Sequence, residues 1–321
     1  MTTLAFHAQV QDLLPEVEAR MRIQTDGYHP SLKKALDQLL DSGGKRVRPT
    51  VVLLVSSMLG VDREDSLNLA AAVELLHTAT LVHDDLIDGS TLRRGSPTLN
   101  STWNAPATIL AGDFLFSQAA SLGARVESPV VMRMFASTLS TIVNGEITQI
   151  FGRNSVTHRQ DYEQRIYAKT ATMFEMAARV PAYLVGKEDK YDGVLRVYGY
   201  SVGMAFQIVD DVLDFSSDAK TLGKPVASDL RIGLLTLPAI YYLEGHPNDE
   251  RLKQFQSGIH LEPKIMEALV EDIAKSGAVE QARAEADQQI QKALTALQQL
   301  PACAERDALA DLANYVVDRL H

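Results

Sequence analysis

Two segments of the chain each place three aspartates at the end of an apolar run, and this feature limits what the chain can fold into. The first reads Leu-Val-His-Asp-Asp-Leu-Ile-Asp over 81–88, and the second reads Phe-Gln-Ile-Val-Asp-Asp-Val-Leu-Asp over 206–214. On a helix, residues four apart share one face, so the outer aspartates of each segment lie on neighbouring turns. Carboxylates buried in apolar surroundings are very costly without a cation. The pattern therefore predicts helices that each bring a carboxylate pair to a cation.

The outer aspartates are the candidate metal ligands. They are Asp84 and Asp88 in the first segment, and Asp210 and Asp214 in the second. All-oxygen ligands suit a hard ion such as Mg²⁺, with Mn²⁺ as a substitute, and substrate phosphate typically completes the coordination. A solvated acidic face is the usual explanation of one such string. Two of them, both inside apolar segments, favour metal binding.

Basic residues follow both segments. Arg93 and Arg94 come after the first, and Lys224 comes after the second. A further basic turn, Gly-Gly-Lys-Arg-Val-Arg-Pro, contains Lys45 and Arg48 and ends in a proline suited to the start of a helix. Free N–H groups at a helix start and cationic side chains both bind anions, so these residues are expected to bind an anion such as phosphate. An ordinary solvated basic turn is the alternative for Lys45 and Arg48.

Helical periodicity runs through most of the chain. The expected helical segments are 5–25, 30–42, 66–88, 105–124, 129–152, 159–185 and 191–215, followed by more helix beyond residue 233. No alternating Val/Ile/Thr run indicates a sheet. We expect an all-α fold, a single domain over residues 1–321 with helices around a deep central cavity.

Polar residues interrupt some of these helices. Glu146 and Gln149 share a helix face, and Lys169-Thr170 interrupts the next helix. Inward polar groups indicate a lined cavity, with a hydrogen-bonded helix contact as the alternative. The polar stretch 216–233 is predicted to be a loop that closes over bound diphosphate.

Composition narrows the possible partners and location. The 321 residues carry a net charge of −10, which disfavours nucleic acid as a partner. The single cysteine, Cys303, fits a reducing compartment. The N-terminus lacks signal-peptide features, and no apolar stretch reaches the ~18 residues of a membrane span. We expect a cytoplasmic protein without a membrane span.

The joint pattern of motifs resembles the trans-prenyl diphosphate synthases, the family of farnesyl, geranylgeranyl and long-chain polyprenyl diphosphate synthases. The resemblance runs from about residue 40 to about residue 245. It consists of the basic turn, the first aspartate segment with Arg93-Arg94-Gly95, Gly145-Glu146 with Gln149, Lys169-Thr170, and the second aspartate segment with Gln207 and Lys224. The resemblance implies an enzyme that joins isopentenyl diphosphate to an allylic diphosphate, uses about three Mg²⁺ ions and forms a homodimer. We expect the long apolar helices from about 105 to 150 to form its interface.

The resemblance also implies roles for individual residues. It assigns isopentenyl diphosphate to Lys45, Arg48, His77 and Arg94, and the departing diphosphate to Arg93, Lys169 and Lys224. Thr170 and Gln207 join them as substrate-binding residues. The four outer aspartates would hold the metal ions, and the released diphosphate would take the proton.

Product length is predicted from the residues just upstream of the first aspartate segment. In the family, a bulky aromatic residue there blocks the growing tail, but here Ala79 and Thr80 stand in its place. A helical wheel puts Thr80 about 40° from Asp84 and Ala79 about 140° away, so the role of Ala79 comes from the resemblance alone. We expect a long-chain product of about C30–C50, of the octaprenyl or solanesyl type.

Other functions remain open at this point. A shorter geranylgeranyl or farnesyl product would result if a residue on a facing helix closed the cavity. A terpene cyclase or head-to-head synthase is disfavoured by the second diphosphate site. A noncatalytic subunit is disfavoured by the presence of all four metal aspartates, and a helical scaffold without a ligand would need none of these motifs.

Overall fold

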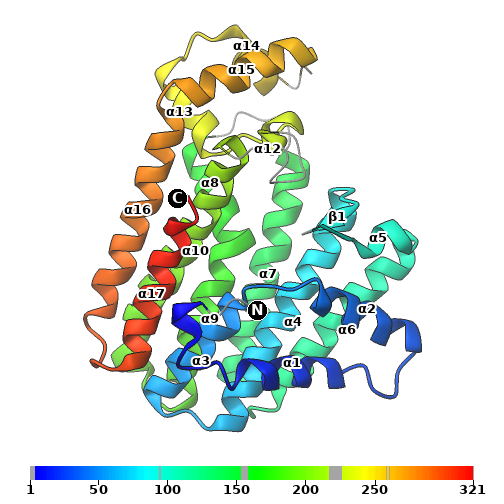
Figure 1. Cartoon of the computed structure of the whole chain (residues 1–321), viewed down its shortest axis with the longest axis vertical. Helices are drawn as coiled ribbons and strands as arrows, with labels where there is room; N and C mark the ends of the chain where they lie inside the picture. The colour runs from blue at the N-terminus through cyan, green and yellow to red at the C-terminus, as the bar shows by residue number, and fades with distance from the viewer. Residues whose placement is uncertain are drawn as a thin grey trace. The chain divides into compact units, whose positions relative to one another are not determined.

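The chain is helical almost throughout, as the sequence predicts. The computed structural model describes residues 4–93, 95–152, 158–216, 226–257, 259 and 261–320. Within these ranges the single sheet is a two-stranded hairpin in which β1 (Leu92–Arg93) pairs antiparallel with β2 (Ser96–Pro97). The predicted all-α class is therefore confirmed. Figure 1 traces the helices from blue at the N-terminus to red at the C-terminus.

The chain divides into two compact units, each assembled from three stretches of sequence. The first contains Met1–Ser137, Met176–Arg196 and Gln298–Leu312, and the second contains Thr138–Glu175, Val197–Leu297 and Ala313–His321. The predicted single domain over residues 1–321 stays a prediction.

The helices of the first unit lie mostly in its N-terminal stretch. They are η1 (Ala5–His7), α1 (Leu14–Ile23), α2 (Pro30–Asp41), α3 (Val47–Leu59), α4 (Arg63–Ile87), α5 (Leu99–Thr102) and α6 (Ala105–Ala124). The predicted helix over 5–25 is wrong in its first half, where a 3₁₀ turn precedes α1. Pro15 stands in the first turn of α1, where its missing N–H has no helical partner to lose, so the helix starts there.

The second unit contains several shorter helices and one long one. They are α8 (Arg159–Ile166), the π-helical turn η2 (Tyr167–Ala171), α12 (Ser228–Arg231), α13 (Leu237–Gly245), α14 (Glu250–Gln256), α15 (Pro263–Lys275) and α16 (Ala278–Leu297). Four helices contribute to both units: α7 (Pro129–Gly152), α9 (Thr172–Leu184), α10 (Glu188–Ser216) and α17 (Ala304–Asp318). The predicted segments 105–124 and 129–152 coincide with α6 and α7.

Helix α4 is the centre of the first unit. It packs against α1, α3 and α6, and its run Ala70, Ala71 and Ala72 is fully buried. Asp62 caps its start by accepting a hydrogen bond from the Glu64 N–H at 2.8 Å. Small residues let neighbouring helices approach α4 closely, which explains how a helix of mixed composition is buried along most of its length.

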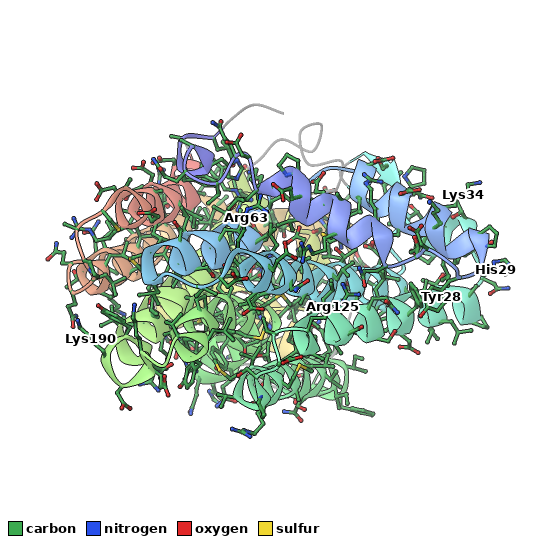
Figure 2. The ribbon with its side chains drawn as sticks, turned by 90° about the horizontal axis from the view of Figure 1, so that it is seen from below. Tyr28, His29, Lys34, Arg63, Arg125 and Lys190 are labelled. Carbon is green, nitrogen blue, oxygen red and sulfur yellow. The ribbon has the colours of Figure 1, made fainter. Side chains whose placement is uncertain are left out.

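The surface of the first unit carries the charged ends of its helices. Arg63, the first residue of α4, is labelled in Figure 2. It forms an ion pair with Glu16 of α1. Tyr28 is 56% exposed and packs edge-on against Phe114 of α6, with ring centroids 4.9 Å apart. These contacts attach α1 and α2 to the buried core of the unit.

Two predicted segments in the second unit have more local structure than expected. The predicted helix 159–185 is divided into α8, the π-helical turn η2, which contains Lys169 and Thr170, and α9. The predicted loop 216–233 contains α12, and its residues 217–225 lie outside the described residues. No helix within the described ranges combines the length and apolar character that a membrane crossing needs.

Candidate active site

The middle aspartate of the first segment is used inside the protein. Asp85 is 4% exposed, and its carboxylate accepts hydrogen bonds from Arg93. Arg93 Nε donates to both carboxylate oxygens at 3.0 Å, and Nη2 donates to Oδ1 at 2.8 Å. The outer Asp84 and Asp88 are half-buried and exposed, respectively. Successive helical residues point about 100° apart, so one face of α4 binds Arg93 while the other presents the outer pair. Arg93 was predicted to bind diphosphate, and that role stays a prediction.

The hairpin β1–β2 is attached to the end of α4 by backbone acceptors. Gly89 has φ of +64°, which turns the chain out of the helix. Asn100 Nδ2 then donates to the carbonyls of Asp85 at 3.2 Å and Ser90 at 2.9 Å, and Thr98 Oγ1 donates to Ser90 O at 2.8 Å. These bonds fix the position of Arg93 relative to the aspartates.

His83, which directly precedes Asp84, points into α6. Its Nε2 lies 3.1 Å from the carbonyl of Ile109 and 3.6 Å from Asp113 Oδ1. The imidazole fits because residue 112 is glycine: a Cβ there would lie 2.2 Å from His83 Nε2. This contact attaches the C-terminal end of α4 to α6 and so helps to orient Asp84.

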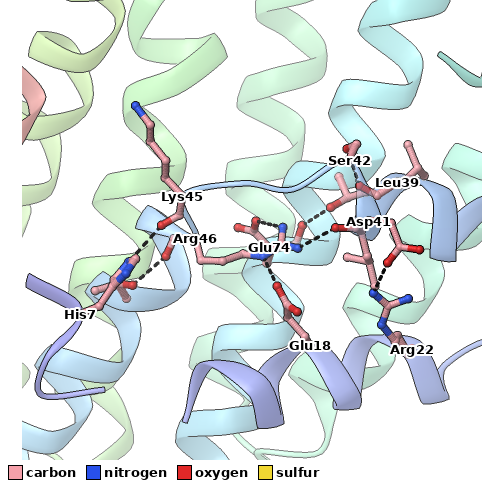
Figure 3. Close-up of polar contacts among 12 residues, drawn as sticks. His7, Glu18, Arg22, Leu39, Asp41, Ser42, Lys45, Arg46 and Glu74 are labelled. Atoms are coloured by element: carbon pink, nitrogen blue, oxygen red, sulfur yellow. Dashed lines mark hydrogen bonds and ion pairs between the residues drawn. The ribbon is translucent and has the colours of Figure 1, made fainter. Parts of the chain in front are cut away.

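The basic turn is anchored by Arg46, for which no role is predicted from the sequence. Arg46 is buried; its Nε donates to Glu18 at 2.7 Å, and its Nη1 donates to Glu74 of α4 at 3.0 Å. Lys45 is exposed and extends away from Glu18, while its carbonyl accepts from His7 at 3.1 Å (Figure 3). The turn is therefore held by Arg46 and presents Lys45.

The other residues predicted for isopentenyl diphosphate belong to the same unit. Arg48 is buried in the first turn of α3, and His77 is half-buried on α4. Arg94 lies outside the described residues. Ala79 is fully buried in α4, whereas Thr80 is half-buried and donates from Oγ1 to His77 O at 2.8 Å. Joint binding of one anion, and a role in product length, stay predictions.

The second aspartate segment repeats the arrangement of the first. Its middle residue, Asp211, is 3% exposed and accepts hydrogen bonds from Tyr162 Oη at 2.8 Å and Gln207 Nε2 at 3.0 Å. Thr170 Oγ1 donates to Gln207 Oε1 at 2.8 Å, so two predicted substrate-binding residues are in contact with each other. Burial, together with the nearby Asp229, raises the pKa of Asp211 to about 7.

Lys169 lies in the π-helical turn and pairs with α7. Its Nζ is 3.1 Å from Glu146 Oε1, so two polar residues singled out in the sequence meet. Gly145 makes this approach possible, because a Cβ at that position would lie 2.4 Å from the Ala168 Cβ. π-Helical turns occur frequently at functional sites, and this one aims a cation at a carboxylate on the neighbouring helix.

The outer aspartates of the second segment have partners on elements that follow it in the chain. Asp210 Oδ1 accepts from Arg319 Nη2 at 2.7 Å. Asp214 accepts from Ser228 Oγ at 2.8 Å and from the Asp229 N–H at 3.2 Å, which places its carboxylate at the start of α12. Lys224 lies outside the described residues.

The donor set fits a hard divalent cation that binds together with a phosphate. In both segments the buried middle carboxylate is satisfied internally, so the outer carboxylates are the ones placed to bind a ligand. No group of three or more His, Cys, Asp and Glu side chains forms a metal cage in the described part of the chain. Mg²⁺ is typically held by one or two protein carboxylates together with water and substrate phosphate, and the outer carboxylates could supply such ligands.

Four features of this site are not predicted from the sequence. Tyr162 and Arg46 are ordinary residues of polar segments, and Arg319 lies 109 residues beyond Asp210. The separate role of the middle aspartates had a signal, because an adjacent helical residue points about 100° away from the outer pair. Long-range partners such as Arg319 leave no such signal.

Comparison with known proteins decides the family. The model of the polyprenyl synthetase family matches residues 29–273. The chain belongs to the polyprenyl synthetase family. It is 35% identical over 305 residues to heptaprenyl diphosphate synthase component 2 of Bacillus subtilis, covering 95% of this chain and 86% of that protein. It is 37% identical over 284 residues to an all-trans-nonaprenyl-diphosphate synthase of Rhodobacter capsulatus, covering 88% and 87%.

The fold of this polyprenyl synthetase agrees with that of its solved relatives. A decaprenyl diphosphate synthase structure from Rhodobacter capsulatus superimposes with a TM-score of 0.91 at 32% identity, covering 98% of each chain. The resemblance given by the motifs is confirmed, and the protein is a prenyltransferase.

Proposed function

We propose that this prenyltransferase condenses isopentenyl diphosphate head to tail with an allylic diphosphate and releases a long-chain all-trans polyprenyl diphosphate. The observation that carries the proposal is the difference in burial between the middle and the outer aspartates of both segments. Asp85 and Asp211 are buried and bonded internally, while the outer aspartates of both segments are half-buried or exposed near the C-terminal ends of α4 and α10. Relatives named for products of seven, nine and ten prenyl units support the long-chain assignment.

The outer pairs would hold the metal ions. Asp84 with Asp88 and Asp210 with Asp214 are the proposed ligands, for about three Mg²⁺ ions by family resemblance. When bound, the ions neutralise the allylic diphosphate and make it a better leaving group. By family resemblance these ligands would surround one diphosphate, and the facing arrangement of the two pairs stays a prediction.

The cationic side chains would orient and stabilise the two diphosphates. Lys169 is held by Glu146 at 3.1 Å, which fixes its ammonium group for a departing anion. Lys45 extends from a turn that Arg46 anchors, and it would bind isopentenyl diphosphate together with Arg48 and His77. Apolar helix walls would exclude water, which otherwise quenches the allylic cation.

Rate measurements test the metal mechanism. Asp84→Ala and Asp210→Ala each remove one ligand and should lower turnover by on the order of several powers of ten. Asp287→Ala, at an exposed position of α16, is the matched control and should be unchanged. Full activity of either ligand variant, or full wild-type activity in EDTA, would rule the mechanism out.

Product analysis tests the length of the chain. With excess isopentenyl diphosphate the wild type should yield products of about C30–C50, as the family resemblance implies. Ala79→Tyr and Thr80→Tyr should shorten the product to about C15–C20, since overlap in a packed interior is costly. Because Ala79 is fully buried, its variant also needs a thermal unfolding control, whereas Thr80 is half-buried. A wild-type product of C20 or shorter would refute the long-chain assignment.

We also propose a homodimer, in which α7 supplies part of the interface. Val143, Ile147, Ile150 and Phe151 are 46%, 48%, 41% and 85% exposed and recur at helical spacing on one face. In the first unit, α6 exposes Ile109 and Leu110, which are adjacent in sequence.

Light scattering tests the dimer. Ile147→Asp should convert the dimer to a monomer at micromolar concentration, because a charge in an apolar interface is uncompensated. Val197→Asp is the control, since Val197 is 42% exposed but lies on α10. A fully active wild-type monomer would contradict the proposal.

A further inference from the structure

Arg319 connects the C-terminal end of the chain to the second aspartate segment. The residue directly follows α17, and its Nη2 donates to Asp210 Oδ1 at 2.7 Å. The guanidinium also lies over the ring of Phe206, with Cζ 4.8 Å from the ring centroid. Phe206 is four residues before Asp210 on α10, so one side chain contacts two successive turns of the same helix.

The environment of the guanidinium strengthens this contact. The Arg319 side chain is 19% exposed, and its Nη1 is buried without a hydrogen-bond partner among the described residues. The other terminal nitrogen, Nη2, donates to Asp210. A charge-assisted bond of this length, partly shielded from water and stacked on an aromatic ring, is stronger than an exposed ion pair.

We propose that Arg319 is a built-in counter-cation of the second aspartate pair, which holds Asp210 in the metal-free enzyme and opposes the binding of a divalent cation. The inference rests on the proposed role of Asp210 as a metal ligand. A divalent cation on this carboxylate would lie next to the guanidinium, and the two positive charges repel. Metal binding therefore weakens the Asp210–Arg319 bond and loosens the C-terminal turn from α10.

Asp214 reinforces the same coupling. Its carboxylate accepts from Ser228 and from the Asp229 N–H, so both outer aspartates of this segment have protein partners. Occupation of the pair by a cation must change the contacts of both. The C-terminal turn and the start of α12 are thus linked to one event.

Mn²⁺ binding, followed by the electron paramagnetic resonance of free Mn²⁺, tests the proposal without using turnover. Arg319→Met keeps the packing on Phe206 but removes the charge, and Arg319→Gln is a second neutral variant. Loss of the competing bond should tighten Mn²⁺ binding about three- to tenfold, the range expected for a charge-assisted bond discounted for partial exposure. Arg319→Lys retains the charge and should stay within about twofold of wild type.

Arg306→Gln is the matched control. Arg306 lies on α17, the helix that Arg319 directly follows, and pairs with Asp307, outside either aspartate segment. Its variant should therefore bind Mn²⁺ like wild type. Unchanged or weaker Mn²⁺ binding by both neutral Arg319 variants would overturn the proposal. Weaker binding would show that Arg319 orients the ligand instead of opposing the metal.

Asp210→Asn separates failure of this proposal from failure of the proposed function. If this variant weakens Mn²⁺ binding while the neutral Arg319 variants do not tighten it, only the counter-cation role is wrong. If Asp210→Asn leaves Mn²⁺ binding unchanged, or the wild type binds none, both are wrong. Hydrogen exchange gives a second readout: Mn²⁺ with inorganic pyrophosphate should increase exchange in residues 313–320, and unchanged exchange would also overturn the proposal.

Discussion

Replacing Arg46 with methionine should destabilise the protein far more than replacing a surface arginine. Arg46 is 7% exposed and donates to Glu18 at 2.7 Å, to Glu74 at 3.0 Å and to the carbonyl of Leu40 at 3.3 Å. Its backbone has φ of +46°, but methionine also carries a Cβ, so the strain of that conformation is the same in both proteins. The change therefore isolates the lost charge and its hydrogen bonds.

The magnitude follows from the burial of the partner that remains. Glu74 has a side chain 7% exposed, so water cannot replace the guanidinium there, whereas Glu18 is 22% exposed and regains some solvation. Removing one partner of a buried ion pair costs about 3–5 kcal/mol. Arg22 is 34% exposed and pairs with Asp37 and Asp41, so Arg22→Met should cost about 0–1 kcal/mol.

Urea unfolding measures the difference. The free energy of unfolding should fall by about 3–5 kcal/mol in Arg46→Met, and adding Glu74→Gln should recover most of this loss because no charge is left buried. The single variant should also raise the KM for isopentenyl diphosphate, since the turn that carries Lys45 loses its anchor. A loss equal to that of Arg22→Met, or no recovery in the double variant, would refute the reasoning.

Two further predictions follow from local contacts. Gly112→Ala should lower the free energy of unfolding by about 1–3 kcal/mol, because the new Cβ displaces His83, and His83→Ala in the same chain should restore most of it in a urea titration. Asp249→Asn tests acid stability: the Arg251 side-chain hydrogen bond lowers the pKa of Asp249 to about 2, below its unfolded value of 3.8. The carboxylate therefore stabilises the fold above pH 4 and loses this effect as the pH falls towards 2. Asp249→Asn should be less stable than wild type by about 1–2 kcal/mol at neutral pH. Thermal melts should show this difference in stability closing near pH 2. A constant gap across that range would contradict the assignment.

The sequence predicts the helices well because their signals are local. Proline and an N-cap residue mark the starts of α6 and α7, and the predicted bounds of both agree with the structure. The helix expected over 5–25 is wrong before Leu14, where the helical pattern continues but Pro15 favours a new start. Periodicity reports which residues share a face, and it does not report where one helix ends and another begins.

The candidate site is predictable in its charges but not in its pairings. The outer aspartates and the polar residues of the interrupted helices follow from spacing and residue type. The contacts of Lys169 with Glu146 and of Arg319 with Asp210 depend on how distant segments pack, and nothing in the local sequence records that. The role of Arg93 illustrates the same limit: its position after the aspartates was visible, but its bonds to Asp85 needed the hairpin.

The burial of the middle aspartates has a consequence for how variants of this enzyme should be measured. Substitutions at Asp85 and Asp211 remove internal bonds, so they should reduce the amount of folded protein in a cell. Substitutions at Asp84 and Asp88, which are half-buried and exposed, should leave the protein abundant and inactive. A screen that scores growth alone would merge these two groups of variants. A screen that records protein abundance as well as activity would separate variants of adjacent residues in the same five-residue motif.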